Sequence, residues 1–311
     1  MTGDASGTSD LALRGRSIGR TGSLVVVACV YLAAIAVAIV VVDVFADEPL
    51  LAVNLALFAA SGVVYAASCS LRNGSCFDAY WSVAPPLVAV YWLAEAAPGA
   101  NGARQLLVTA LVFLWGIRLT ANWVRSWPGL DHEDWRYTQM YRDAPAPTWV
   151  VSLFGVHLFP TVQIALGCLA LRFALATGTD GFGVLDIVAG IVTVAAIGIE
   201  TIADEQRRSF ARTAGPGEWC QRGLWARSRH PNYFGEVAFW CGLFAFGLAA
   251  DLDAWWTVVG PFAMIAMMLG ASVPMMDRRN AERRPGYAER AGSLPALVPR
   301  GRPPRTLPTK S

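Results

Sequence analysis

Polar residues that could do chemistry are densest between residues 200 and 236 of this chain. Glu200 and Asp204 are four residues apart, and in a helix this spacing puts both carboxylates on one face. Asn232 and Glu236 repeat the spacing directly after Pro231, which suits the first turn of a helix because its missing N–H costs nothing there. The amide and the carboxylate of this second pair could hold an amide or the ribose hydroxyls of a ligand.

Basic residues fill the stretch between the two pairs. Arg207, Arg208 and Arg212 follow the first pair, and Arg229 and His230 come just before the second. Guanidinium groups match phosphate oxygens in a two-pronged geometry, so the pattern predicts a pocket that binds anions at its mouth. A dinucleotide fits this arrangement, with its phosphates near the arginines and a polar ring deeper between the helices. The alternative for any single arginine is a solvated, positively charged loop.

Several other classes of site are excluded by what the sequence lacks. It contains no GxGxxG run and no Walker loop, which excludes a Rossmann or P-loop nucleotide domain. Its six cysteines form no CxxC pair and its three histidines lie far apart, so we expect no metal site and no disulfide framework. The net charge of +2 implies no nucleic-acid partner.

The elements that must position these residues are membrane-spanning helices. Hydrophobic residues make up 55% of the 311 residues and charged residues 15%, whereas soluble domains have about 25% charged residues. The apolar residues come in blocks of roughly 20, the length that the hydrocarbon core of a bilayer requires. The composition therefore predicts an all-α, polytopic membrane helix bundle.

Eight apolar segments, each bounded by turn or charge signals, are the predicted spans. They cover residues 22–46, 50–71, 79–97, 103–124, 149–176, 182–203, 232–250 and 254–276. Together they define a membrane domain over residues 22–291, between an N-terminal tail of residues 1–21 and a Pro/Arg-rich C-terminal tail of residues 292–311.

Lys and Arg are distributed unevenly between the two sides of the predicted bundle. The N-terminal tail, the loops 125–148 and 205–230 and the tail after Asp277 hold nearly all of them, while the opposite turns hold only Arg104. Cytoplasmic loops retain Lys and Arg. Both termini and both long loops are therefore predicted to lie in the cytoplasm, with the bundle in the inner (plasma) membrane of the cell.

Residues 223–236 resemble the signature of the steroid 5-alpha-reductase superfamily. They are most similar to the bacterial branch formerly named a domain of unknown function. Four further elements resemble the same branch: residues 77–82, 115–123, 132–137 and 283–287. The resemblance extends over roughly residues 50–300, so the first predicted helix looks like an addition to seven family spans.

The resemblance implies an integral membrane reductase that binds NADPH between its helices and their cytoplasmic loops. Asn232 and Glu236 match the family residues that hold the nicotinamide side, and Asp204 matches the acid on the adenosine side. Arg208 falls near a phosphate-side base, and Arg118 matches on its own helix. The expected cofactor-binding residues are Arg118, Asn122, Glu200, Asp204, Arg208, Arg229, His230, Asn232, Tyr233, Glu236 and Tyr287.

The same resemblance directs attention to the reduced substrate. Animal members reduce a 3-oxo-4-ene with a Glu–Tyr pair that polarises the ketone. Here Trp115 occupies the Tyr position and Asp78 is the nearest counterpart of the Glu, so Tyr80 is the predicted source of the hydroxyl. Glu200 also departs from the family, because animal members have Asn there. The predicted reaction is the reduction of an enone in a steroid-like or other lipid substrate that enters from the bilayer.

In that reaction, hydride addition to the C=C bond leaves negative charge on the carbonyl oxygen, and positioned donors in a dry site stabilise it. Asp78 and Tyr80 are therefore the predicted catalytic residues. Burial raises the pKa of a carboxyl group, so Asp78 could carry the proton. The structural alternative for Asp78 is a cap on the third span.

Two rival functions remain open from the sequence. Membrane methyltransferases of the isoprenylcysteine carboxyl methyltransferase type share an Arg-His-Pro-x-Tyr-x-Gly core and use S-adenosylmethionine. In them a pair of glutamates follows on the last helix, where this chain has residues 277–282 with a single Glu282. A transporter or scaffold is the non-enzymatic rival; Pro85-Pro86 and Pro160 interrupt spans, but no repeat is visible. The sequence does not reveal the oligomeric state.

Overall fold

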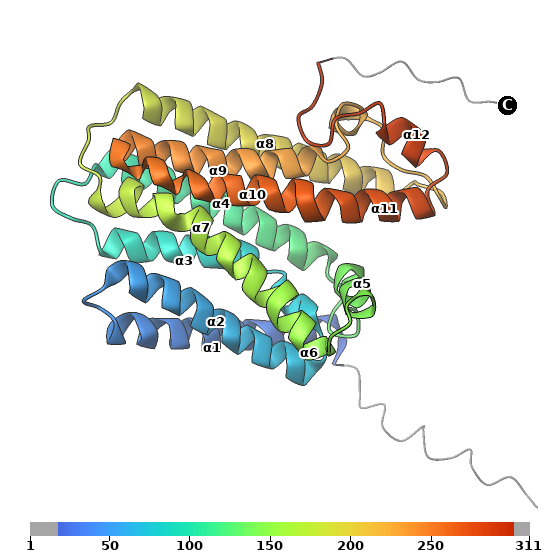
Figure 1. Ribbon diagram of the computed structural model, residues 1–311, viewed down its shortest axis with the longest axis horizontal. Coiled ribbons are helices and arrows are strands. Elements are labelled where there is room, and N and C mark those ends of the chain that lie inside the picture. Colours follow the sequence, from blue (N-terminus) through green and yellow to red (C-terminus); the bar gives the residue numbers. More distant parts are fainter. Residues whose placement is uncertain (1–17, 302–311) are drawn as a thin grey trace, which may run out of the picture. The chain divides into compact units, whose positions relative to one another are not determined.

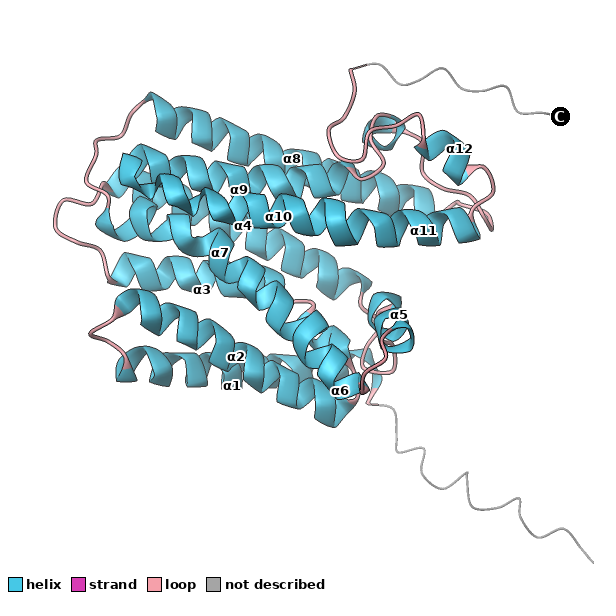
Figure 2. Ribbon diagram, viewed as in Figure 1, coloured by secondary structure: helices cyan, strands magenta, loops and turns pink. Residues whose placement is uncertain are grey.

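The computed structural model describes residues 18–301 of the chain. Every regular element in that range is a helix, and the described residues contain no strand (Figure 2). The all-α class predicted from composition is confirmed. Most of the predicted N-terminal tail and the last ten residues of the predicted C-terminal tail lie outside the described residues.

Seven helical runs among the described residues are long and apolar enough to cross a bilayer. They are Gly19–Val44, Pro49–Leu71, Gly102–Ser126, Thr148–Thr177, Val184–Ala211, Pro231–Ala250 and Leu252–Arg283. The chain is therefore a multi-pass membrane protein. The third predicted span, residues 79–97, forms only the 15-residue helix α3, Tyr80–Ala94. At roughly 22 Å this helix is shorter than the hydrocarbon layer of about 30 Å, because it ends before Pro98 and Gly99.

The chain forms two compact units. The first comprises the residues up to Trp81 together with Leu119–Thr161. Its described elements are α1 (Gly19–Val44), α2 (Pro49–Leu71), η1 (Gly74–Phe77), the end of α4, α5 (Trp135–Asp143), α6 (Thr148–Val151) and η2 (Ser152–Leu158). α1 and α2 pack against each other as a hairpin, and η1 packs on α2. The fully buried His157 lies within hydrogen-bond distance of Ser152 O and Ser68 Oγ, at 2.9 and 3.1 Å, and joins η2 to α2.

The second unit comprises Ser82–Arg118 and the residues from Val162 onward. Its elements are most of α3, of α4 (Gly102–Ser126) and of α7 (Phe159–Arg172), together with η3 (Phe173–Thr177), α8 (Val184–Ala211), η4 (Gly223–Ala226), α9 (Pro231–Ala250), η5 (Leu252–Val258), α10 (Val259–Met267), η6 (Met268–Ser272), α11 (Val273–Arg283) and α12 (Tyr287–Ala291). Figure 1 shows α9 lying between α8 and the α10–α11 run, in agreement with its contacts to α8 and α10.

Glycines bring α8 and α9 into close contact. A Cβ atom on Gly235 would lie 2.7 Å from Glu200 Cβ and 2.8 Å from Ala196 O, and one on Gly242 would overlap the side chain of Thr193. Small residues allow helices in a membrane to approach each other closely, where packing replaces the hydrophobic effect as the driving force. We call this contact the glycine seam, and it places the polar residues of α9 directly against those of α8.

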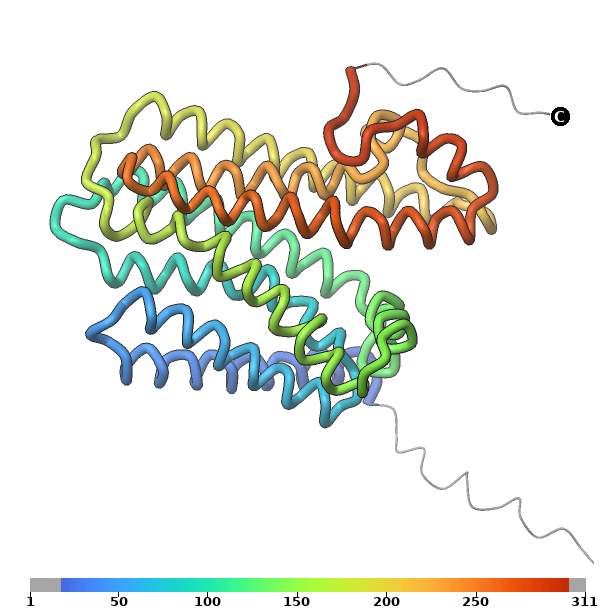
Figure 3. Tube along the Cα trace, in the orientation of Figure 1, coloured from blue at the N-terminus to red at the C-terminus, as the bar shows by residue number. Residues whose placement is uncertain are grey.

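Two helical runs of the second unit are longer than a bilayer needs. α8 has 28 residues and the run Leu252–Arg283, a continuous tube in Figure 3, has 32. At about 1.5 Å per residue these are roughly 42 and 48 Å long, so one end of each extends past a hydrocarbon layer of about 30 Å. The predicted spans end at residues 203 and 276, and the helices continue beyond them to Ala211 and Arg283. Charged and amide residues with good helix propensity, such as Glu205 and Gln206, continue the helix after the apolar run stops.

A buried ion pair ties the beginnings of α4 and α8 together. Arg104 is fully buried, and its Nε and Nη2 atoms lie 2.6 and 2.9 Å from the two carboxylate oxygens of Asp186. The guanidinium also donates to the carbonyl oxygens of Asp180, Gly181 and Ala249 at 2.8–3.1 Å. A buried charge is stable only when it is paired and its remaining hydrogen bonds are made. This network meets both conditions.

Candidate functional site

A second arginine of α4 lies between two carboxylates of α8. Arg118 Nη1 is 2.7 Å from Glu200 Oε2, and Nη2 donates to Asp204 Oδ2. The structure thus brings Glu200 and Asp204 together on one helix face, as their spacing predicts. All three side chains belong to the second unit and are mostly buried, with exposed fractions of 6–16%.

Glu236 of α9 adds a third carboxylate beside this group. Gly235 sits against Glu200 in the glycine seam, and Glu236 follows it with only 4% of its surface exposed. Its two carboxylate oxygens accept hydrogen bonds from Trp115 Nε1, at 3.1 Å, and Trp240 Nε1, at 2.9 Å. We call Arg118, Glu200, Asp204 and Glu236 the acid cluster. It holds three carboxyl groups and one guanidinium.

Asn232, one turn before Glu236, has an unused acceptor. Its Oδ1 atom is buried and has no hydrogen-bond partner among residues 18–301. A buried polar atom left in this state costs about 1–3 kcal/mol. The position therefore suits a ligand that brings a hydrogen-bond donor, such as a carboxamide or a hydroxyl.

A cavity of about 180 Å³ lies where α8 and α11 extend past the predicted hydrocarbon layer. We call it the arginine pocket, because three guanidinium groups line it from different elements. Its charged, polar and aromatic lining consists of Arg207, Phe210, Glu218, Trp219, Trp225, Arg229, His230, Asn280, Arg284 and Tyr287. Three arginines against the single carboxylate of Glu218 give the lining a positive charge, which suits a phosphate group.

One wall of the arginine pocket is held by Asp277 of α11. Its carboxylate accepts from Arg229 Nη1, lies 2.9 Å from His230 Nε2 and accepts from the Tyr287 hydroxyl at 2.5 Å. Burial and the bond to Asp277 raise the pKa of Tyr287 to about 12, so this hydroxyl stays a donor at neutral pH. Tyr233 stacks on the His230 ring with centroids 5.1 Å apart. Asp277 was not among the predicted site residues.

The other two arginines of the pocket contact no carboxylate in the described part of the chain. Arg207 lies over the Trp225 ring, 5.7 Å from its centroid, and Arg284 Nη1 donates to Asn280 Oδ1 at 2.8 Å. Burial, followed by the charge of Arg207, lowers the pKa of Arg284. These guanidinium groups are therefore available to an anion. The predicted Arg208 lies outside the lining and pairs with Glu205 at 3.6 Å.

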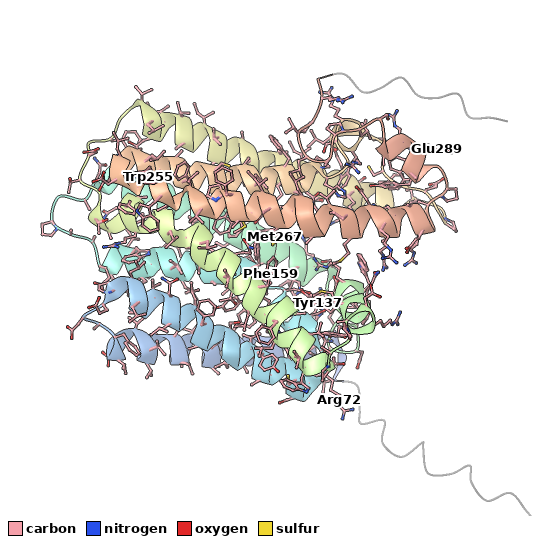
Figure 4. The ribbon with its side chains drawn as sticks, in the orientation of Figure 1. Arg72, Tyr137, Phe159, Trp255, Met267 and Glu289 are labelled. Atoms are coloured by element: carbon pink, nitrogen blue, oxygen red, sulfur yellow. The ribbon has the colours of Figure 1, made fainter. Side chains whose placement is uncertain are left out.

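The predicted catalytic residues lie in the first unit, at the junction of η1 and α3. Asp78 accepts a hydrogen bond from the hydroxyl of Tyr137, which is on α5 (Figure 4). Arg136 Nη2 is 3.9 Å from the same carboxylate and bonds more closely to Asp134, at 2.9 Å. Burial raises the pKa of Asp78 to about 6, against the opposing effects of Arg136 and Tyr137. A carboxyl group in this state exchanges its proton near neutral pH.

Tyr80, the predicted source of the hydroxyl, lies buried at the start of α3. Its side chain is 4% exposed, and its hydroxyl donates to Leu57 O at 2.6 Å. The proton of Tyr80 is thus committed to the backbone of α2, and Tyr137 is the hydroxyl that meets Asp78. The two residues are 59 positions apart. Each residue belongs to one of the two elements, 77–82 and 132–137, that the sequence analysis singled out. Their contact was not predicted, and their presence in these two elements was the sequence feature that could have suggested it.

Comparison with known proteins identifies the family. A family model described as a protein of unknown function, DUF1295, matches residues 64–292. The chain belongs to the DUF1295 family. It is also 24% identical over 271 residues to an uncharacterized protein of Schizosaccharomyces pombe, an alignment that covers 78% of this chain and 77% of the yeast protein. No solved structure matches the chain significantly.

The DUF1295 match covers both candidate regions. It begins within α2 and ends just after α12, so it contains Asp78, Tyr137, the acid cluster and the whole lining of the arginine pocket. α1 lies outside it, as expected for an additional first helix. Asn122 also lies within the match, one turn after Arg118 on α4 but in the first unit.

Proposed function

We propose that this DUF1295 protein is a membrane-embedded, NADPH-dependent reductase of an electron-poor C=C bond in a steroid-like or other lipid substrate. The observation that carries the proposal is the buried, unused acceptor of Asn232, which along the chain lies between His230 of the arginine pocket and Glu236 of the acid cluster. It offers a place for a donor-bearing ring, and a basic pocket for phosphates follows along the same helices.

The spacing of these groups along α8 supports one elongated ligand. Glu200 and Asp204 precede Arg207 by seven and three residues, which is roughly 10 and 5 Å along the helix axis. A dinucleotide has a carboxamide at one end and phosphates toward the other. Asn232 would accept from the carboxamide, while Arg207 and Arg284 would bind phosphate oxygens.

NADPH supplies a hydride to the substrate when it is bound. The chain must then stabilise the negative charge that collects on the carbonyl oxygen of the enone as its C=C bond is reduced. Within the first unit, a protonated Asp78 is a hydrogen-bond donor of the kind that this step needs, and the Tyr137 hydroxyl contacts it. A raised carboxyl pKa keeps a proton available near neutral pH, and its transfer to the substrate completes the saturated ketone.

The membrane orientation belongs to the same proposal. The arginine pocket lies at the end of α8 and α11 where basic residues are concentrated, and cytoplasmic segments retain such residues. We place this end in the cytoplasm, where NADPH is dissolved, and both termini with it. An apolar enone would reach the bundle from the inner (plasma) membrane itself.

The test is a titration of the detergent-purified protein with NADPH and, separately, with S-adenosylmethionine, followed by calorimetry. We expect the protein to bind NADPH, and we expect Asn232→Ala to weaken binding roughly fivefold, the effect of about one hydrogen bond. Ser126→Ala, at an exposed position of α4, is the matched control and should bind normally. Absence of NADPH binding rejects the reductase, and binding of S-adenosylmethionine alone would support the methyltransferase instead.

A further inference from the structure

The chain continues past α12 and runs beside the residues that precede α9. We call residues 293–300 the tail segment. The backbone N–H groups of Arg229 and His230 donate to Pro295 O and Ala296 O, each at 3.0 Å. In the opposite direction, Arg300 N donates to Arg227 O at 3.0 Å. The tail segment thus pairs with the backbone of residues 227–230, although neither segment forms a regular strand.

Ser228 is the centre of this pairing. It is fully buried, and its Oγ lies 3.1 and 2.6 Å from the carbonyl oxygens of Ala296 and Leu297. The same oxygen accepts from His230 N at 3.2 Å. Leu294, only 5% exposed, anchors the beginning of the tail segment. A single hydroxyl therefore ties the tail segment to the residues before α9.

These contacts fix two residues that form part of the wall of the arginine pocket. Arg229 and His230 line the pocket, and their side chains are fixed by Asp277 while their backbone is fixed by the tail segment. No residue of the tail segment lines the pocket itself. The tail segment also follows the end of the DUF1295 match at residue 292, so the family model does not account for it.

We propose that Ser228 and the tail segment are positioning elements that hold the Arg229 and His230 wall in place, so that the arginine pocket keeps the shape in which Arg207 and Arg284 bind a phosphate group. The inference rests on the proposed function, since the phosphate is that of the dinucleotide. Loss of the pairing frees two backbone N–H groups and lets the pocket wall move, so the arginine pocket loses its preformed geometry. Binding of the phosphate-bearing end then weakens, whereas the acid cluster and Asn232 are unaffected.

The experiment compares the full chain with a truncation after Gly292 and a control truncation after Gly301, which keeps the tail segment. Adenosine 2′,5′-bisphosphate, which carries phosphates and no nicotinamide, is the probe of the pocket, and NADPH is the complete ligand. We expect the truncation after Gly292 to weaken both by roughly tenfold, the effect of about one charge-assisted hydrogen bond. The control truncation should match the full chain. The KM for NADPH should rise with kcat unchanged at saturation, which separates positioning from general damage.

Ser228→Ala provides a second variant should the truncated chain fail to fold, and it should change KM in the same direction by a smaller factor. Hydrogen exchange at the Arg229 and His230 amides is an independent readout, because it reports the pairing whether or not a cofactor binds. If the full chain binds neither probe, the proposed function fails. If exchange at these amides increases while both affinities stay unchanged, the positioning role is rejected and the reductase stands.

Discussion

Two arginines on α4 meet carboxylates on α8 in the same register and with different results. Arg104 and Arg118 are 14 residues apart, as are their partners Asp186 and Glu200. At Arg104 one guanidinium meets one carboxylate, three carbonyl oxygens complete its hydrogen bonds, and nothing is exposed. At Arg118 one guanidinium meets two carboxylates, with Glu236 beside them and the unused Asn232 acceptor one turn away.

The difference separates a closed structural ion pair from the cluster that we propose as part of the cofactor site. A closed network with matched charges has no group left to bind anything else, and its role is to hold helices together. A network with more carboxyl groups than cations is stable only when some of them are protonated or when a ligand supplies donors. The chain therefore uses one helix pair for both purposes, at opposite ends.

The largest expected effect is the loss of stability in Arg104→Met. Removing the guanidinium leaves the Asp186 carboxylate buried without its partner, which costs about 3–5 kcal/mol. Thermal unfolding of the detergent-purified protein should show this as a clear fall in the midpoint. The double variant Arg104→Met with Asp186→Leu should recover much of the loss, because it removes both charges. An unchanged midpoint in the single variant would contradict a structural role for this pair.

Arg118→Met should change binding more than stability. Glu200 and Asp204 lose their shared cation, but both can take up protons, so we expect a smaller fall in the unfolding midpoint than for Arg104→Met. NADPH affinity should fall by at least about tenfold, or 1.4 kcal/mol, because the acid cluster loses its arrangement. The unfolding midpoint and the NADPH affinity should both be measured for Arg104→Met and for Arg118→Met. A stability loss equal to that of Arg104→Met, with affinity intact, would make the two ion pairs equivalent.

In the first unit, the role of Asp78 can be tested by the dependence of activity and stability on pH. Its pKa is raised to about 6, so the protonated, donating form falls roughly tenfold per pH unit above that value. The rate of enone reduction should decline correspondingly between pH 6 and 8. The free energy of unfolding changes with pH in the direction opposite to that of a salt-bridged acid. The stability contributed by the neutral Asp78 carboxyl is full below pH 3.8 and is lost as the pH rises to about 6. Asp78→Asn should flatten both profiles, and a decline that persists in this variant assigns the proton to another group.

The smallest effect is expected for Arg278→Ala, which breaks the exposed pair with Glu282 on α11. Their atoms are 3.0 Å apart, but both side chains are more than half exposed. Pairs of this kind contribute about 0.3–0.5 kcal/mol, and salt screens them. The unfolding midpoint and NADPH affinity should therefore match the parent protein. A large effect here would show that charge alone, without burial, determines stability in this region.

The sequence predicted those features of the fold that depend on local patterns of residues. Long apolar runs gave the spans, and the i, i+4 spacing placed Glu200 and Asp204 on one face, where Arg118 meets both. The prediction did not extend to the helical turns that continue beyond the apolar runs. α8 and α11 continue through charged turns, and those turns build the arginine pocket.

The missed site residues are those whose partners are distant in the sequence. Asp277 meets Arg229 across 48 positions, and Tyr137 meets Asp78 across 59. Nothing in the spacing of either pair predicts contact, because it depends on how whole helices pack. Tyr80 was the predicted source of the hydroxyl, and its O–H group donates to Leu57 O, whereas no contact between Tyr137 and Asp78 was predicted.

The glycine seam between α8 and α9 has a consequence for how the site can adapt. At Gly235 a Cβ atom would collide with the backbone and the Glu200 Cβ of α8, and at Gly242 it would overlap the Thr193 side chain, so the helices have little room to slide along each other. Asn232 and Glu236 therefore keep one fixed height relative to Glu200 and Asp204. Any adjustment to a bound molecule must come from rotation of side chains, because the residues before α9 are held by the tail segment and by Asp277.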